Sequence, residues 1–296
     1  MSEKKRDLYR FAMFVLPALG IYGLFYAYPI LSGFYYSLTD WNGFGDVPRF
    51  SGLSNFIELY HDELIRIAFK NNLILSVVVI VVQNALALGL AVLLHQKIRG
   101  RTLFRATLFV PALLSSAVIG YIWEYIYSPL QGVLHTTFGA LGLETLADVN
   151  WLGDPAYALF SICAVIIWQF TGYSMVIYIA GLQTIPVDLY EAADIDGAGT
   201  LQKFRKITIP LLASAFTINM MISLIGCLKM FDQVYLLTQG GPAHQTEVFG
   251  TLIYSIAFKT QRLGYGTALA MVLTVLILIV SYVQYRILSK REVEYG

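Results

Sequence analysis

Charged side chains are scarce in this sequence of 296 residues. Asp, Glu, Lys and Arg make up 13% of it and apolar residues 57%, against about 25% and 45–50% in soluble domains. Six stretches contain none of these four charged residues: Phe11–Thr39, Asn71–Gln96, Ala106–Trp123, Pro155–Val187, Ile207–Leu228 and Leu263–Tyr285. Each reaches the length of about 18–25 residues that a helix needs to cross roughly 30 Å of hydrocarbon. The sequence predicts an all-α integral membrane protein with about six transmembrane helices, because the backbone of a spanning segment must satisfy its own hydrogen bonds.

Residue patterns that carry chemistry are also missing. The sequence contains no phosphate-binding Gly-x-x-x-x-Gly-Lys loop, no Gly-Lys dipeptide, no His-x-x-x-His pair and no Gly-x-Ser-x-Gly motif. The two cysteines, Cys163 and Cys227, fall in the predicted fourth and fifth spans, which disfavours a structural disulfide or a zinc site and favours apolar packing. We therefore expect no catalytic residue, no metal and no cofactor bound by this chain.

The basic residues are distributed unevenly between the connections. Fourteen of the twenty Lys and Arg residues lie in the N-terminal tail, in the second and fourth connections and in the C-terminal tail. Loops rich in Lys and Arg face the cytoplasm. Six spans bring both termini to the same side, so we predict that both termini are cytoplasmic. The first, third and fifth connections, which are long and rich in Gly, Pro, Asn, Trp and Asp, are then external.

One domain, residues 1–296, is predicted, and its fourth connection, residues 183–210, is unlike a simple turn. Thr184 can cap a helix with Pro186 in its first turn, and Gly197 or Gly199 can end that helix in a left-handed conformation. A second helical piece follows before Pro210 opens the fifth span. The residues alone leave two interpretations open: a surface that docks another protein, or a loop that lies on lipid headgroups.

The spacing within this connection resembles the Glu-Ala-Ala loop of binding-protein-dependent ABC importer permeases, Glu-Ala-Ala-x3-Gly-x9-Ile-x-Leu-Pro. The matching positions are Glu191, Ala192, Ala193, Gly197, Ile207, Ile209 (in place of Leu) and Pro210. Further similarity is seen at Leu16-Pro17, Tyr28-Pro29, Asn71-Asn72-Leu73, Phe104-Arg105, Pro111, Trp151–Pro155, Leu237–Pro242 and Thr246. The last two are similar to the carbohydrate branch, and within it to the subunit type of the larger maltose-transporter membrane protein, without its extra N-terminal spans and large external insertion.

This resemblance implies a fold, partners and a mechanism. It implies type I ABC importer permease architecture and pairing with a second, related permease. It also implies a dimer of ATP-binding subunits that hold ATP and Mg, and an external solute-binding protein or lipoprotein. The expected setting is the lipid of a bacterial or archaeal cell membrane, with no nucleic acid bound. ATP-driven movement would reach the spans through Glu191, Ala192, Ala193, Asp196, Gly197 and Pro210.

Polar residues along the spans outline a path for solute. Asn219, Ser223, Cys227 and Met230 recur at i, i+4, i+8 and i+11, which is one helical stripe. The resemblance adds Ser116 and Tyr173, which together with Ser223 keep the residue type found at the maltose subunit's sugar site, whereas Gly226, Cys227 and Met230 match in register with changed chemistry. Hydroxyl and amide groups beside aromatic faces suit a carbohydrate. The alternative is that these groups satisfy one another between packed helices.

Three other classes of function agree less well with the sequence. An ion-coupled transporter predicts a carboxylate inside the membrane or helices broken at its midplane, and no Asp or Glu lies centrally in a predicted span. A scaffolding protein leaves the spacing of residues 183–210 unexplained. An exporter is disfavoured because that loop is typical of importers.

Overall fold

The computed structural model describes residues 3–44, 48–96 and 98–291, and helices are the regular elements throughout these residues. One isolated antiparallel bridge joins Thr39 and Phe50. Four helices are long and apolar enough to cross a membrane, and there are up to six if each of two bent helix pairs is one span. The prediction of an all-α membrane protein with about six spans is confirmed.

The chain forms two compact units, Met1–Asp62 with Ile253–Thr274 and Glu63–Leu252 with Val275–Gly296. The organisation as one domain, residues 1–296, stays a prediction. The first unit contains α1 (Glu3–Tyr22), the π-helical turn η1 (Gly23–Ala27), α2 (Tyr28–Ser37), α3 (Ser54–His61), η3 (Ser255–Lys259) and the first half of α16 (Leu263–Leu288). The apolar side chains of α1 and α2 are exposed, as expected of a span that faces lipid.

An ion pair in the first unit joins α3 to the residue before α16. The Arg262 guanidinium donates to both carboxylate oxygens of Glu58 at 2.8 and 2.6 Å, and the Tyr265 hydroxyl donates to Asp62 at 2.8 Å. The hydrogen bond from Arg262 holds the pKa of the Glu58 carboxyl below its ordinary value.

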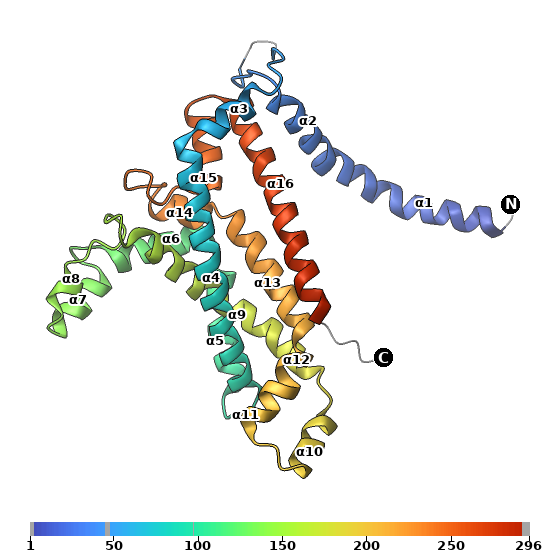
Figure 1. Cartoon of the computed structure of the whole chain (residues 1–296), viewed down its shortest axis with the longest axis vertical. Helices are drawn as coiled ribbons and strands as arrows, with labels where there is room; N and C mark the ends of the chain where they lie inside the picture. The colour runs from blue at the N-terminus through green and yellow to red at the C-terminus, as the bar shows by residue number, and fades with distance from the viewer. Residues whose placement is uncertain (1–2, 45–47, 97, 292–296) are drawn as a thin grey trace. The chain divides into compact units, whose positions relative to one another are not determined.

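The second unit contains α4 (Glu63–His95), α5 (Arg101–Leu113), α6 (Ser116–Tyr127), α7 (Val133–Ala140), α8 (Glu144–Ala147), α9 (Ala158–Gln183), α10 (Val187–Ile195), α11 (Thr200–Lys203), η2 (Phe204–Thr208), α12 (Ile209–Leu211), α13 (Ala213–Leu228), α14 (Asp232–Leu237) and most of α15 (Phe249–Tyr254). Helix α9 is its centre and packs against α4, α5 and α13 (Figure 1). Two buried apolar clusters form there, one around Ile162 and Ile166, the other around Met175 and Tyr178.

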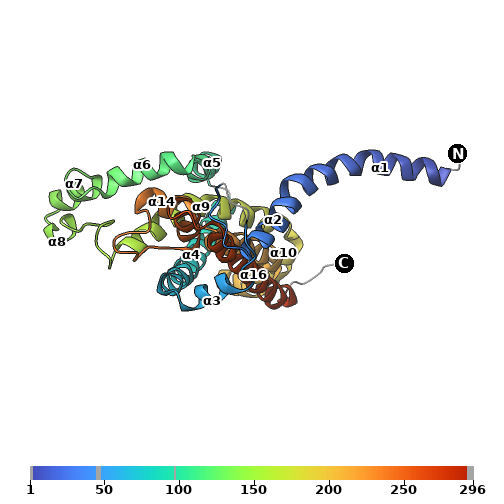
Figure 2. The ribbon, with the colours of Figure 1, turned by 90° about the horizontal axis from the view of Figure 1, so that it is seen from above.

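The third predicted span is not one straight helix. Helices α5 and α6 meet at 99°, and Figure 2 shows α6 leading away from α5 towards α7 and α8. Leu114 and Ser115 adopt extended backbone, and the Ser115 side chain accepts a hydrogen bond from the Val118 amide, so it caps the new helix. An uncharged stretch predicts length and burial, but it does not distinguish a straight helix from a broken one.

The fifth predicted span is bent by 65° where α12 meets α13. Proline explains the irregular backbone ahead of this bend. Pro210 has no amide hydrogen and its ring displaces the preceding turn, and the π-helical η2 ends two residues before it. The same arrangement occurs in the first unit, where η1 ends two residues before Pro29. The prediction that Pro210 opens the fifth span is therefore wrong: the helical residues Thr200–Leu211 run through Pro210, and the main helix of the span begins at Ala213.

Candidate functional site

Residues 183–210 fold into two short helical pieces joined by a tight turn, as predicted. Helix α10 begins two residues later than expected: Pro186 occupies the N-cap position, and Thr184 instead ends α9 by donating its hydroxyl to the Gly181 carbonyl at 2.8 Å. The predicted Thr184 cap is therefore wrong. Thr184 follows α9 directly, so its hydroxyl finds a carbonyl of that helix before it can reach an amide of the next.

Gly197 ends α10 in the left-handed conformation, with φ of +74°. The Ala198 amide donates to the Ala193 carbonyl at 2.8 Å and the Gly197 amide to the Asp194 carbonyl at 3.1 Å, the two bonds of a Schellman motif. Gly199, the alternative, has ordinary backbone and precedes α11. A side chain at Gly197 would meet open space, so only the backbone conformation requires glycine there.

Two further contacts tie the pieces of loop 183–210 together. The Lys203 ammonium contacts the Asp194 carboxylate at 2.6 Å, and the hydroxyls of Tyr190 and Thr208 lie 2.9 Å apart. Leu189 and Tyr190 pack on the buried cluster around Met175 and Tyr178. One face of α10 is thus held by the protein core. The Tyr190–Thr208 contact also connects α10 to the last residue of η2, which leads into α12.

The other face of α10 is exposed and acidic. It carries Asp188, Glu191 and Asp194 together with the exposed apolar side chains of Val187 and Ile195, and Asp196 directly follows the helix. Ala192 is exposed and Ala193 is half-buried. A helix that is fixed on one side and presents carboxylates and apolar side chains on the other can fit a cleft with basic and apolar groups.

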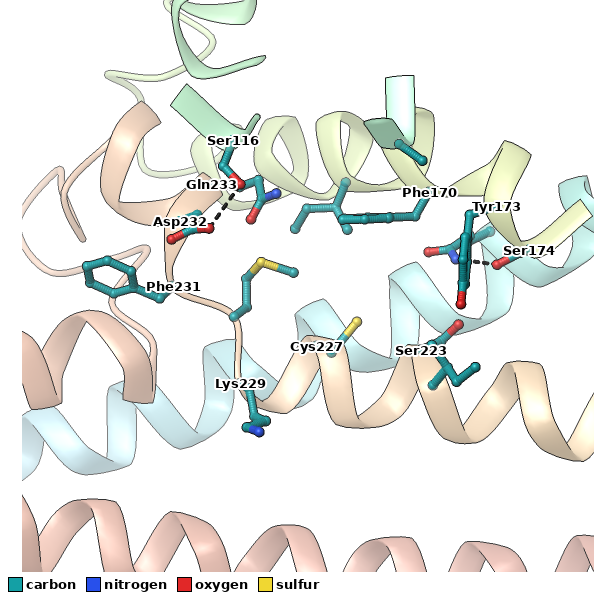
Figure 3. A pocket seen from close by; sticks show the side chains of 16 residues that line it. Ser116, Phe170, Tyr173, Ser174, Ser223, Cys227, Lys229, Phe231, Asp232 and Gln233 are labelled. Atoms are coloured by element: carbon teal, nitrogen blue, oxygen red, sulfur yellow. Dashed lines mark hydrogen bonds between the residues drawn. The ribbon is translucent and has the colours of Figure 1, made fainter. Parts of the chain in front are cut away.

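A cavity of about 470 Å³ lies in the second unit, between α9, α13 and the junctions α5–α6 and α13–α14. Five of the six residues that were predicted to meet solute are among those that line it: Ser116, Tyr173, Ser223, Cys227 and Met230. Figure 3 shows their side chains arriving from three separate segments. Tyr173 is 38% exposed, and its ring lies parallel to that of Phe109 at 6.4 Å.

The polar groups of the cavity include unpartnered ones. The Ser223 hydroxyl is buried and has no hydrogen-bond partner among the described residues. The Gln83 amide donates to Ser174 at 2.7 Å, and the Gln233 amide donates to Gln169 at 2.7 Å. Hydroxyl and amide groups beside the faces of Phe170 and Tyr173 match the chemistry of a polyhydroxylated ligand.

Asn219 was predicted to meet solute together with these residues, but it lies outside the cavity. It is 0% exposed, its amide donates to the Ser174 carbonyl at 3.1 Å, and it is not among the residues lining the cavity. It lies on the same stripe of α13 as Ser223, but one turn further towards α12, where α9 packs directly against α13. The Asn219 side chain therefore connects α13 to α9, which agrees with the interpretation that polar groups pack between helices rather than line a solute path.

Asp232 and Gln233 line the cavity and were not singled out from the sequence. The Ser116 hydroxyl donates to the Asp232 carboxylate at 2.9 Å, joining the first residue of α6 to the first residue of α14 (Figure 3). The sequence does place Asp232 directly after the polar stripe of the fifth span. Because Asp232 lies far from the centre of an uncharged stretch, however, the sequence argued against a functional role for its carboxylate inside the membrane.

The Asn71-Asn72 pair of α4 binds the backbone on both sides of Thr246 and at the end of α13. The Asn71 amide donates to the carbonyls of Gln245 and Glu247, both at 2.9 Å. The Asn72 amide donates to the Cys227 carbonyl at 3.1 Å, while its oxygen accepts from the Phe249 amide at 2.8 Å. These side chains fix the segment after α14 against the cavity end of α13.

Comparison with known proteins shows which family the sequence matches. Residues 67–293 match the model of the family described as binding-protein-dependent transport system inner membrane component. A probable permease of the starch degradation products transport system of Thermoanaerobacterium thermosulfurigenes is 37% identical over 286 residues, covering 95% of this chain and 94% of that protein. The trehalose/maltose transport system permease MalF of Thermococcus litoralis is 31% identical over 277 residues, covering 91% and 90%.

Solved structures agree on the fold. A chain of a bacterial ABC transporter involved in the import of the acidic polysaccharide alginate superposes with a TM-score of 0.84 at 23% identity, covering 97% of this chain and 96% of that one. The bacterial alginate ABC transporter in complex with an alginate pentasaccharide-bound periplasmic protein gives 0.82 at 24% identity, covering 95% and 94%. The type I ABC importer permease architecture predicted from the sequence is confirmed.

Proposed function

We propose a function from an established premise: the chain belongs to the family of binding-protein-dependent transport system inner membrane components. Within that family we propose that it is the transmembrane channel subunit of an ATP-driven importer for an oligosaccharide or a related carbohydrate. The observation that carries the choice of solute is the cavity, where aromatic faces stand beside hydroxyl and amide groups. The transport systems named for the relatives above, for starch degradation products and for trehalose and maltose, support the same class.

Loop 183–210 is proposed to couple this chain to a separate ATPase. Asp188 lies in the first turn of α10, where the helix dipole favours a carboxylate. Glu191 follows at the middle of the helix, where its exposed carboxylate can pair with a basic group of the partner. Ala192 and Ala193 permit close approach, and Asp196 and Gly197 form the turn. The Tyr190–Thr208 contact then passes movement of α10 to Pro210 and the bend beyond it.

The remaining partners follow from the same proposal. A second, related permease completes the channel as a heterodimer, and two ATP-binding subunits supply ATP hydrolysis, so this chain performs no chemistry. An external binding protein or lipoprotein delivers solute, and the periplasmic protein in the alginate transporter complex supports that assignment. Both termini and α10 are proposed to face the cytoplasm of a bacterial or archaeal cell.

A matched pair of glycines tests the coupling proposal. Gly197→Val forces a β-branched residue into left-handed backbone, at a cost of about 1 kcal/mol or more, and Ala193→Arg obstructs close docking. Gly199→Val is the control, because a side chain there also meets open space but the backbone is ordinary. The complex is purified through a tag on this chain, and co-eluting ATPase and ATP-driven uptake are measured. Full retention and normal uptake in both test variants would refute the coupling role.

A second pair of glycines tests the cavity. Gly226 lines the cavity, and a methyl group added to Gly226 or to Gly89 would meet no atom within 4 Å. Gly226→Phe therefore places a ring at the cavity, and the control Gly89→Phe places the same ring on α4 outside it. Uptake of a panel of labelled oligosaccharides should be lost in Gly226→Phe, Tyr173→Ala and Ser223→Leu, while assembly and basal ATPase activity persist. Normal uptake in these three variants would assign the residues to packing.

An ion-coupled transporter is the second candidate. The two bent spans and the Asp232 carboxylate beside the cavity are features which that class predicts. The two functions differ in their energy source. Uptake into proteoliposomes that requires ATP on the ATPase side and persists without an ion gradient supports the importer. Uptake that requires an ion gradient and persists without ATP supports the ion-coupled transporter.

A further inference from the structure

The charged groups of the cavity are few and unevenly placed. Among the described residues that line it, Asp232 and Lys229 carry charge. Figure 3 shows the Lys229 side chain directed away from Ser223, Cys227 and Asp232, whereas the Asp232 carboxylate lies on the cavity side, next to Ser116 and Gln233. The remaining lining residues are neutral, so Asp232 is the carboxylate that this chain contributes to the cavity.

The position of that carboxylate is fixed. One of its oxygens accepts the Ser116 hydroxyl at 2.9 Å, and Asp232 is the first residue of α14, where the helix dipole favours a negative charge. The carboxylate is partly exposed, so its other acceptor positions are open to a ligand. An ionised carboxylate offers acceptors only, and hydrogen bonds that it accepts are stronger than those between neutral groups.

The neutral partners in the cavity do not compensate this charge. Ser223 and Tyr173 can donate to a ligand or accept from it, and the Gln83 and Gln233 amides are already engaged. A sugar hydroxyl or a sugar ammonium can donate to Asp232. A sugar carboxylate in the same place would meet a charge of the same sign, and like charges at short range repel each other.

We propose that Asp232 is a charge filter of the translocation cavity, which accepts hydrogen bonds from neutral or cationic sugars and excludes sugars that carry carboxylates. This inference rests on the proposed function and narrows its substrate class. It predicts a solute preference opposite to that of the structurally similar transporter, which is involved in importing an acidic polysaccharide.

The field of Asp232 can be measured without knowing the solute. Gly226→Cys, in a background with Cys163→Ala and Cys227→Ser, places a thiol in the open part of the cavity. The assembled transporter in nanodiscs is treated with a cationic trimethylammonium-ethyl and an anionic sulfonatoethyl methanethiosulfonate, and the ratio of the two reaction rates is recorded. Adding Asp232→Asn, which keeps the size of the side chain and can still bond Ser116, should lower the cation-to-anion ratio at least tenfold.

The control removes a charge from the same neighbourhood. Glu124→Gln changes an exposed carboxylate on α6 that does not line the cavity, and it should leave the ratio unchanged. A ratio that Asp232→Asn does not alter overturns the filter. Failure of the thiol to react with either reagent overturns the open cavity on which the filter depends.

Uptake separates this inference from the proposed function. Proteoliposomes holding the full transporter and its binding protein are offered labelled trimers of a neutral hexose, of glucosamine and of galacturonate. Import of the neutral or amino trimer, with its KM raised at least tenfold by Asp232→Asn, supports the filter. Import that favours the galacturonate trimer overturns the filter and leaves the carbohydrate importer standing, whereas ATP-driven import of a solute that is not a carbohydrate overturns both.

Discussion

The two bent spans of the second unit are held in different ways. At the 99° bend, polar groups hold the start of α6: Ser115 caps it and Ser116 bonds Asp232. At the 65° bend, Leu212 is 3% exposed and sits in an apolar cluster. Gly181 packs so closely there that a methyl group on it would come within 2.7 Å of the Ala215 side chain.

This difference suggests a division of labour between the bends. Groups that hydrogen-bond each other across a cavity can exchange partners with a solute that enters it. Close-packed apolar groups deform little and therefore transmit displacement. We infer that the first bend responds to what fills the cavity and that the second carries movement between loop 183–210 and α13.

Breaking the support of the first bend has the largest expected effect. Gly172 of α9 lies against the backbone of α5, so that an added methyl group would overlap the Leu108 carbonyl oxygen. Gly172→Ala should destabilise the purified complex by about 3 kcal/mol, since backbone cannot rotate away as a side chain can. Thermal unfolding measures this loss. Gly89→Ala, with open space around it, should raise stability by about 0.5–1 kcal/mol, and equal behaviour of the two variants would contradict the packing described for α5 and α9.

The second bend can be weakened more gently. Tyr190→Phe removes the hydroxyl that meets Thr208 and keeps the ring that packs on the buried cluster, at a cost of about 1 kcal/mol. If this contact carries movement, uptake should fall while ATPase binding and ATP hydrolysis continue. Tyr157→Phe, an exposed tyrosine before α9, serves as the control. A proportional loss of uptake and ATP hydrolysis would mean that the contact only stabilises the loop.

Loop 183–210 was largely predictable from the sequence because its information is local. The left-handed turn at Gly197 depends on one residue without a side chain, and the helix before it on neighbours within a few positions. Thr184 was misassigned because the end of α9 and the start of α10 compete for its hydroxyl, and sequence spacing does not say which wins.

The cavity was predictable only in part. Periodicity correctly placed Ser223 and Cys227 on one face of α13, whereas Met230 lines the cavity from beyond the end of that helix. Periodicity shows which face of a helix a residue is on but not how deeply it is covered, so Asn219 was included although α9 packs over it. The bends and the role of Asp232 depend on contacts between distant segments. Ser116 and Asp232 are 116 residues apart, and no local pattern links them.

The ion pair of the first unit offers a contrast with the Tyr190–Thr208 contact, which joins two uncharged hydroxyls. Glu58 and Arg262 are each about half exposed, with side-chain exposures of 48% and 49%, so their pairing contributes less than about 1 kcal/mol. The lowered pKa of Glu58 means that its contribution is complete above the ordinary carboxyl pKa of about 4.3 and is lost as pH falls through the folded value. The raised pKa of Arg262 acts in the opposite sense, since its contribution is lost only in strongly alkaline solution, beyond the range where the complex can be studied.

Glu58→Gln should therefore lower the unfolding temperature of the complex slightly at neutral pH, and the gap between wild type and variant should close below about pH 4. Glu124→Gln, which neutralises an exposed carboxylate in the second half of α6, should show no such gap. The Tyr190→Phe difference should stay constant over the same range, because neither hydroxyl changes charge there. A gap for Glu58→Gln that persists undiminished in acid would show that the side chain acts through packing rather than through its charge, and the contrast between charged and uncharged connections would fail.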